Sequence, residues 1–325
     1  DVLIGGLGSD TLLGGAGDDH FLLSSITADE LDIVDGGEGT GDTADFLGFG
    51  AAIWASLEYA GVEVWTRDGI DAQSAGDYRA IADLSGVEHL TGGNYHDWLG
   101  GNAADNILKG ADGNDQISGG AGNDLLDGGA GSDHMQGGTG NDRFVIWESN
   151  AGDLDTIEDS SGDDTVDFSN FGAAVWVDLD YAGVEAWTRD GSDLGAEAGQ
   201  WRAIANMSGI DHLTGTAHDD FLSGDGGGNI LTGSAGSDTL DGGAGVDTMD
   251  GGLGDDLLTS GAGADTVILG AGEDTVTGAR TDFFGDTITD FSSEDTLVFE
   301  GTHFDRSAIS FAASTGLFTL AANGS

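Results

Sequence analysis

The sequence predicts an ordered all-β fold built by repetition of a short unit. Three observations predict it: apolar residues return every nine positions, 61 of the 325 residues are glycine, and proline is absent. Glycine suits repeated tight turns, and strands stacked in a ladder need the backbone N–H that proline lacks. A flexible glycine-rich linker is the alternative interpretation, but a linker has no reason to keep an apolar residue in phase.

The charge of the chain excludes several classes of protein. It carries 60 acidic residues against 8 lysines and arginines, for a formal net charge of −52. Nucleic-acid binding is excluded as a main activity because phosphate contacts need clustered basic residues. The chain has no cysteine for a disulfide scaffold and no apolar run of membrane-spanning length, and its first residues do not have the basic and then apolar pattern expected of a leader. It begins at Asp1 rather than methionine, so we expect it to be part of a longer protein.

The nine-residue period forms one array over residues 83–145, a second over 206–277 and a shorter one at the start of the chain. We count the first glycine of GGAGNDLLD, residue 119, as position 1. Position 8 is then apolar in every repeat, as at Leu108, Leu126 and Leu240. Position 6 carries a carboxylate or an amide throughout: Asp1, Asp10, Asp19, Glu88, Asp97, Asn106, Asp115, Asp124, Asp133, Asp142, Asp211, Asp220, Asn229, Asp238, Asp247, Asp256, Asp265 and Asp274.

The repeats GGAGNDLLD, GGAGSDHMQ, GGTGNDRFV and GGAGVDTMD resemble the repeats-in-toxin (RTX) nonapeptide of secreted bacterial proteins. The resemblance covers a little over half of the chain. It implies that each GGxGxD is a turn and that each following triplet is a short strand. The implied fold class is all-β: a right-handed parallel β-roll, or β-solenoid, with β-hairpin inserts and a β-rich C-terminal cap.

The resemblance also implies calcium binding. Repeats 18 residues apart would stack on one edge at about 4.8 Å, and carboxylates that close repel one another unless a cation lies between them. Calcium prefers six to eight oxygens, which Asp side chains and glycine-turn carbonyls supply. The predicted metal-site aspartates are Asp10, Asp19, Asp97, Asp115, Asp124, Asp133, Asp142, Asp220, Asp238, Asp247, Asp256, Asp265 and Asp274. The predicted metal-site glycines are Gly120, Gly122, Gly129, Gly131, Gly138, Gly140, Gly243, Gly245, Gly252 and Gly254.

We expect Ca²⁺ ions on the order of ten, with weaker or absent sites at Asn106 and Asn229, which lack the charge. One buried leucine in nine glycine-rich residues offsets little of the entropy lost on ordering them. The arrays should therefore fold only with calcium, which binds the folded form alone.

A longer duplication separates the arrays. Residues 51–69 align with 173–191 at 14 of 19 positions, and the alternation of Val175, Val177 and Leu179 followed by 184–188 predicts a β-hairpin. Most large aromatic residues lie in these inserts: Trp54, Tyr59, Trp65, Tyr78, Trp176, Tyr181, Trp187 and Trp201. They could pack the hairpin on the roll, or they could form a glycan platform or a contact between copies of the chain.

These features divide the chain into six segments: a first array at 1–30, insert 1 at 31–82, the second array at 83–145, insert 2 at 146–205, the third array at 206–277 and a cap at 278–325. In the cap we expect Ile288, Phe291, Leu297, Val298 and Phe299 to cover the open core, and a last hairpin to turn around Ser314, Thr315 and Gly316.

No catalytic constellation is present in the sequence. The seven histidines form no HExxH or Cys/His cluster, and we expect them to be solvated turn residues. We therefore predict a non-enzymatic calcium-binding scaffold of a secreted or surface-associated bacterial protein, such as an adhesin, surface-layer or filament subunit. By resemblance it would leave the cell by type I secretion and fold outside. Its expected partners are calcium, copies of itself or surface polysaccharide. The alternative is the secretion and stability module of an extracellular protease, lipase or polysaccharide-modifying enzyme.

Overall fold

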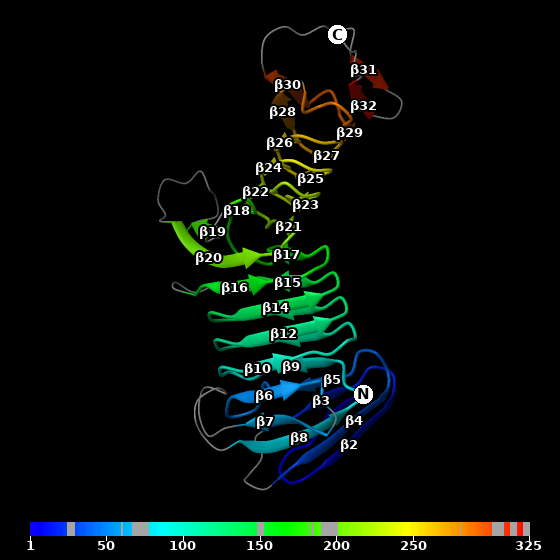
Figure 1. Cartoon of the computed structure of the whole chain (residues 1–325), viewed down its shortest axis with the longest axis vertical. Helices are drawn as coiled ribbons and strands as arrows, with labels where there is room; N and C mark the ends of the chain where they lie inside the picture. The colour runs from blue at the N-terminus through cyan, green and yellow to red at the C-terminus, as the bar shows by residue number, and fades with distance from the viewer. Residues whose placement is uncertain are drawn as a thin grey trace. The chain divides into compact units, whose positions relative to one another are not determined.

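The computed structural model describes residues 1–24, 30–59, 61–66, 78–147, 153–181, 183, 185–189, 201–279, 281–300, 309–312 and 317–320. The chain divides into two compact units, Asp1–Asp164 and Thr165–Ser325. The described residues form strands and turns without an α-helix (Figure 1). Each unit contains two sheets, which we call sheet A and sheet B.

In unit 1, successive strands of the chain alternate between two largely parallel sheets. Sheet A runs β1 (Val2–Ile4), β3 (His20–Leu22), β5 (Thr43–Asp45), β9 (His89–Thr91), β11 (Ile107–Lys109), β13 (Leu125–Asp127) and β15 (Arg143–Val145). Sheet B runs β2 (Thr11–Ala16), β4 (Asp32–Glu38), β8 (Arg79–Ser85), β7 (Val62–Thr66), β6 (Ile53–Ser56), β10 (Trp98–Gly100), β12 (Gln116–Ala121), β14 (His134–Thr139) and β16 (Asp155–Glu158).

Unit 2 repeats this plan. Its sheet A runs β17 (Thr165–Asp167), β21 (His212–Thr214), β23 (Ile230–Thr232), β25 (Thr248–Leu253), β27 (Thr266–Ala271), β29 (Thr287–Thr289), β32 (Leu317–Leu320) and β31 (Ile309–Ala312). Its sheet B runs β20 (Trp201–Ser208), β19 (Ala186–Arg189), β18 (Val175–Asp178), β22 (Phe221–Ser223), β24 (Thr239–Asp241), β26 (Leu257–Thr259), β28 (Thr275–Ala279) and β30 (Thr296–Glu300).

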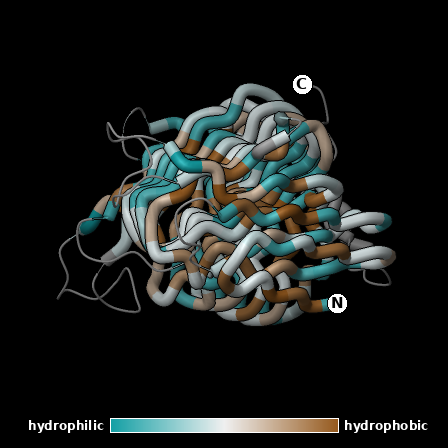
Figure 2. The backbone as a smooth tube through the Cα atoms, turned by 90° about the horizontal axis from the view of Figure 1, so that it is seen from below, coloured by the Kyte–Doolittle hydropathy of each residue, from teal (hydrophilic) through white to brown (hydrophobic). Residues whose placement is uncertain are grey.

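The apolar residue at position 8 of each repeat forms the core between the two sheets. Leu108 pairs in register with Leu126 in sheet A, and Ile117 pairs with Met135 in sheet B. All four side chains are at most 2 % exposed. Many hydrophobic positions lie toward the inside of the coils in Figure 2, although those beside the N-terminus, such as Val2 and Ile4, are exposed. The predicted all-β parallel β-roll is therefore confirmed.

Each insert is part of sheet B and does not lie on its face. In unit 1, β6 pairs with β10, β7 is antiparallel to β6 and β8, and β8 pairs with β4. The predicted hairpin β18–β19 is present, and β20 extends it to a three-stranded meander. Val175 and Val177 are buried, so the apolar side of the hairpin joins the core. Sheet A adds no strand at this point, because β5 pairs directly with β9.

The C-terminal segment continues the ladders before it closes them. Ile288 pairs with Val267 and Leu297 pairs with Val276, in parallel register. Phe299 packs edge to face on Phe283, with 5.1 Å between ring centroids. The expectation for Val298 is wrong: it is 40 % exposed, because alternation along β30 points it away from the core. The predicted last hairpin is formed by β31 and β32, and its expected turn at Ser314, Thr315 and Gly316 lies outside the described residues.

Candidate metal centre

The position 6 carboxylates form ladders along the edges of each unit. The backbone N–H of Asp97 donates to Oδ1 of Asp115 at 2.7 Å, and the N–H of Asp115 donates to Oδ1 of Asp133 at 2.7 Å. On the other edge the N–H of Asp124 donates to Oδ1 of Asp142, also at 2.7 Å. Unit 2 has the same ladder, for example from Asp238 to Asp256 at 2.8 Å. One oxygen of each carboxylate therefore holds two neighbouring coils together.

The second oxygen of these carboxylates is buried and receives no hydrogen bond. The aspartates whose Oδ2 atoms share this property are Asp10, Asp19, Asp42, Asp115, Asp124, Asp133, Asp142, Asp238, Asp247, Asp256, Asp265 and Asp274. All but Asp10 are at most 3 % exposed. A buried carboxylate oxygen without a donor is costly, and a bound cation removes that cost. This donor set, hard carboxylate oxygens beside backbone carbonyls, fits Ca²⁺.

Glycines give the turns the space and the backbone conformation that this arrangement requires. A Cβ at Gly110 would overlap Oδ2 of Asp115 and lie 2.5 Å from the carbonyl oxygen of Gly128. The ten predicted metal-site glycines, at positions 2 and 4, all have φ between 86° and 138°, which side chains disfavour. Position 2 is occupied by Ala111 and Ser234 in two turns, with φ of 79° and 81°. These two residues are strained.

Burial raises the pKa of the ladder carboxylates far above that of an ordinary aspartate. Desolvation raises the pKa of Asp115 and Asp238 to about 8, although a backbone N–H donated to each lowers it. It raises the pKa of Asp133 and Asp256 to about 7 and that of Asp124 to about 6. Without a cation, these groups would hold protons near neutral pH.

Four position 6 residues near the inserts, two aspartates and two asparagines, have a different set of hydrogen bonds. Both oxygens of Asp97 accept a backbone N–H, from Ile53 at 2.7 Å and from Gly93 at 2.6 Å. Asp220 accepts from Val175 at 2.7 Å and from Thr216 at 2.6 Å. These two predicted metal-site residues therefore complete their hydrogen bonding within the protein.

The two asparagines complete their hydrogen bonding within the protein through the side-chain amide. Asn106 accepts from the N–H of Asn102 at 2.8 Å and donates through Nδ2 to the carbonyl of Glu88 at 2.7 Å. Asn229 donates to the carbonyl of Asp211, also at 2.7 Å. The side-chain N–H thus contacts a carbonyl of the neighbouring coil, where the aspartate turns have a carboxylate oxygen without a donor.

Six further aspartates extend the ladders and were missed by the nine-residue frame. Asp155 accepts from the N–H of Asp133 at 3.0 Å, over a separation of 22 residues. The others are Asp32, Asp42, Asp164, Asp286 and Asp295. A local sequence pattern could have identified them. All but Asp32 are followed by threonine and then by an apolar or small residue, and the same pattern begins many strands of the arrays.

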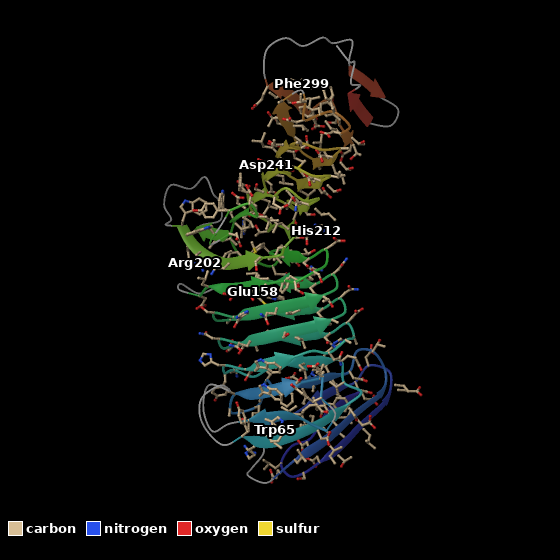
Figure 3. All side chains as sticks on the ribbon, viewed as in Figure 1. Trp65, Glu158, Arg202, His212, Asp241 and Phe299 are labelled. Carbon is tan, nitrogen blue, oxygen red and sulfur yellow. The ribbon has the colours of Figure 1, made fainter. Side chains whose placement is uncertain are left out.

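The histidines are not simply solvated, as expected from the sequence, because several bridge adjacent coils. Nδ1 of His89 accepts the N–H of Ile107 at 2.9 Å. Nδ1 of His212, which is labelled in Figure 3, accepts the N–H of Ile230 at 3.0 Å. His96 accepts from Asn114 at 2.6 Å. Burial lowers the pKa of His89, which favours the neutral ring that this bond requires.

Comparison with known families agrees with this geometry. A family model for the RTX calcium-binding nonapeptide repeat matches residues 1–24, 84–117, 91–126, 109–144, 207–231, 223–258 and 250–280, together about half of the chain. No curated protein matches the chain. Within the described residues no helix is long and apolar enough to span a membrane. The chain belongs to the family of RTX calcium-binding nonapeptide-repeat proteins.

Proposed function

We propose that this calcium-binding β-roll is a structural module of a secreted or surface-associated bacterial protein, where it folds on binding calcium outside the cell. The buried Oδ2 atoms that receive no hydrogen bond carry the proposal. Weak sites of about 10⁻⁴ to 10⁻³ M stay empty at cytosolic calcium and fill outside. The chain would then cross the envelope unfolded, by type I secretion, and would fold with ions on the order of ten.

The experiment compares the far-ultraviolet circular dichroism of the full chain in chelator and in millimolar calcium. We expect an extended chain without calcium and a β-rich spectrum with it, because the entropy of ordering glycine-rich turns is offset only by the ions. Magnesium at the same concentration is the control, since Mg²⁺ needs stricter octahedral geometry. Equal β content in chelator and in calcium would contradict the proposal.

We consider two kinds of parent protein for this module. The duplication of array and insert favours a long scaffold such as an adhesin, surface-layer or filament subunit, and the alternative is a stability module of an extracellular protease, lipase or polysaccharide-modifying enzyme. The sequence adjoining this chain in its parent protein separates them. Further units of the same kind would support the scaffold, and a hydrolase or zinc-protease motif would support the enzyme.

A second candidate function rests on the outer face of the inserts. Trp176, Tyr181, Trp187 and Trp201 line a pocket of about 340 Å³, and Trp54, Trp65 and Tyr78 line one of about 350 Å³ in unit 1. The expectation that aromatics hold the insert on the roll is met in part, because Trp54 stacks on Trp98 at 4.8 Å and Trp176 on Phe221 at 5.4 Å.

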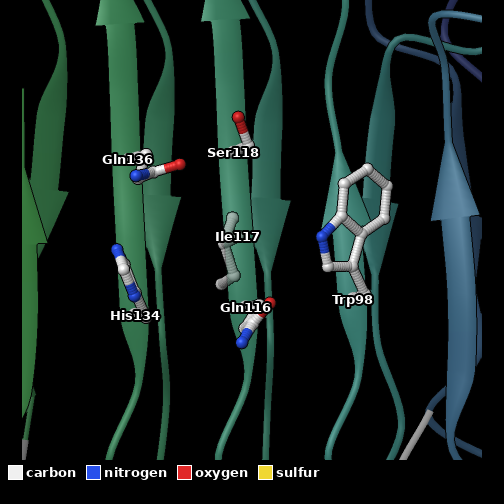
Figure 4. Close-up of a pocket in the computed structure, with 6 residues that line it drawn as sticks. All are labelled: Trp98, Gln116, Ile117, Ser118, His134 and Gln136. Carbon is white, nitrogen blue, oxygen red and sulfur yellow. The ribbon is translucent and has the colours of Figure 1, made fainter. Parts of the chain in front are cut away.

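The outer face of the neighbouring array is different. Beyond Trp98, strands β12 and β14 present Gln116, Ser118, His134 and Gln136, while Ile117 points into the core (Figure 4). Aromatic side chains are therefore concentrated on the inserts of an otherwise polar face.

We infer that these pockets bind neutral polysaccharide, since ring faces stack on flat apolar C–H surfaces and the net charge of −52 repels anionic polymers. Affinity electrophoresis in calcium tests this inference. Neutral glycans should retard the chain, and the pair Trp65→Ala with Trp187→Ala should abolish the effect. Trp147→Ala, on a side chain 46 % exposed and outside both pockets, is the control. Absence of retardation by every glycan, or retardation unchanged in the double variant, would contradict it.

A further inference from the structure

The turn after the second array carries an aspartate at a position where most repeats have glycine. Residues 159–167, DSSGDDTVD, follow the nonapeptide pattern with Asp159 at position 1. Asp159 accepts the N–H of Gly138 at 2.9 Å, so it lies on the turn that begins at Gly137. Asp164 is the position 6 residue of the same turn, and its Oδ1 accepts the N–H of Asp142 at 2.8 Å.

Three carboxylates converge at this point. One oxygen of each of Asp142, Asp159 and Asp164 lies within 4.8 Å of the others. Asp142 is 2 % exposed, and its Oδ2 receives no hydrogen bond. A Cβ placed on Gly137 would overlap the Oδ2 atoms of both Asp142 and Asp159, so these two oxygens point at one location.

The corresponding turn of unit 2 shows that an aspartate at position 1 does not by itself make such a cluster. Asp290 is the equivalent residue in DFSSEDTLV, residues 290–298. Its two oxygens accept the N–H groups of Leu269 and Gly270, each at 3.0 Å, just as those of Asp159 accept the N–H groups of Gly138 and Ser161. The two aspartates therefore differ in the carboxylates around them and not in their own hydrogen bonds. Among the described residues, only Asp142, Asp159 and Asp164 form a group of three potential ligands this close together.

We propose that Asp142, Asp159 and Asp164 form a calcium site of higher affinity than the glycine-type turns, which fills first as calcium rises. The proposal rests on the calcium-dependent function proposed above. A glycine-type turn pair brings two position 6 carboxylates to an ion, whereas this pair adds a third. Calcium affinity rises with the number of charged ligands, and repulsion among three clustered carboxylates is relieved by the ion. We expect the site to bind at least tenfold more tightly than the others.

The test is a calcium titration of the decalcified full chain by isothermal calorimetry, with a competing chelator of known affinity to resolve the tightest ion. Asp159→Asn removes the third charge, and Asp159→Gly restores the repeat residue. Asp163→Asn removes an exposed charge on the same turn and is the matched control. The wild type and the control should show one ion at least tenfold tighter than the rest. Both Asp159 variants should lose this tight ion, while Asp159→Gly still binds the weaker ones.

The outcomes separate this inference from the function it rests on. A tight ion that persists in both Asp159 variants, or a wild type whose ions all bind equally, would overturn the three-carboxylate site alone. A wild type that binds no calcium would overturn the proposed function as well. Circular dichroism in saturating calcium verifies that each variant folds, and Asp159→Gly keeps the test decisive if Asp159→Asn does not.

Discussion

Two kinds of turn occur in the arrays of this protein, and they differ at position 6. In the middle of the arrays, Asp124 gives one oxygen to the N–H of Asn106 and keeps the other buried without a donor. Beside the inserts, Asp97 receives an N–H at each oxygen, and Asn106 supplies its own N–H to a carbonyl. The difference teaches that a coil can satisfy its buried oxygens either with a cation or with an amide. We therefore expect calcium dependence to belong to individual turns, in line with the function proposed above.

The largest expected effect comes from lowering the pH, because protons then bind the array carboxylates in place of the cation. The folded pKa of Asp115 is about 8 and that of Asp133 about 7, both above the ordinary value of 3.8. The folded, calcium-free roll thus binds more protons than the unfolded chain. Its stability is greatest below pH 4 and is lost as pH rises to about 8. Circular dichroism of decalcified protein should show β structure increasing from pH 8 to pH 5.

The same protons compete with calcium, so calcium affinity should fall as pH drops below about 7. Calorimetry at pH 8 and pH 6 measures that change. A β signal independent of pH without calcium would show that the array carboxylates are not buried as described.

A single array turn gives the next largest effect. Asp124→Ala removes a buried ligand oxygen and leaves the N–H of Asn106 without its acceptor, for a loss of about 3 kcal/mol in calcium. Asp105→Ala is the matched control, because position 5 is exposed and should lose less than about 0.5 kcal/mol. Urea unfolding in saturating calcium gives both values. Equal losses would contradict the assignment of position 6 as the inward residue.

The next prediction exchanges asparagine and aspartate at position 6, which converts one kind of turn into the other. Asn106→Asp replaces the N–H that contacts the carbonyl of Glu88 with a charged oxygen, so this turn should acquire a need for calcium. We expect one more bound ion and a loss of about 1 to 2 kcal/mol at low calcium, from the broken hydrogen bond. Asp124→Asn is the reverse change and should lose an ion. Calorimetric ion counts that stay constant in both variants would remove the distinction between the two turns.

The smallest effect concerns backbone strain at position 2 of two array turns, those that contain Asp115 and Asp238. Ala111 adopts φ of 79° at a position where most repeats have glycine. Ala111→Gly relieves that strain and should raise the free energy of unfolding by about 1 kcal/mol, less the greater entropy that glycine gives the unfolded chain. Ser234→Gly, at the equivalent place in unit 2, should behave alike. Thermal unfolding in calcium measures both, and a lower melting temperature in either would argue against the assigned turn geometry.

The nine-residue period of the sequence predicted the coils that repeat every 18 residues. The nine-residue frame placed Leu126 in the core and Asp115 below Asp133, because each coil repeats the same backbone. It missed Asp155 and Asp286, since coils of 21 and 22 residues shift the count while preserving the ladder. It did not distinguish Asp97 from Asp115, whose Oδ1 atoms both accept an N–H from another coil. The difference lies at Oδ2, which in Asp97 accepts the N–H of Gly93, four residues earlier, and which the nine-residue pattern of residue types does not reveal.

The inserts also determine how the chain can start to fold. Strands β6, β7 and β8 pair antiparallel with near neighbours in sequence, whereas each array strand waits for a partner a full coil away. Hairpins close in microseconds, and contacts local in sequence form ahead of distant ones. The meander therefore forms early, and its two outer strands offer edges to β4 and to β10. Coils can grow from these edges in both directions, and under the function proposed above we expect growth into the arrays to require calcium.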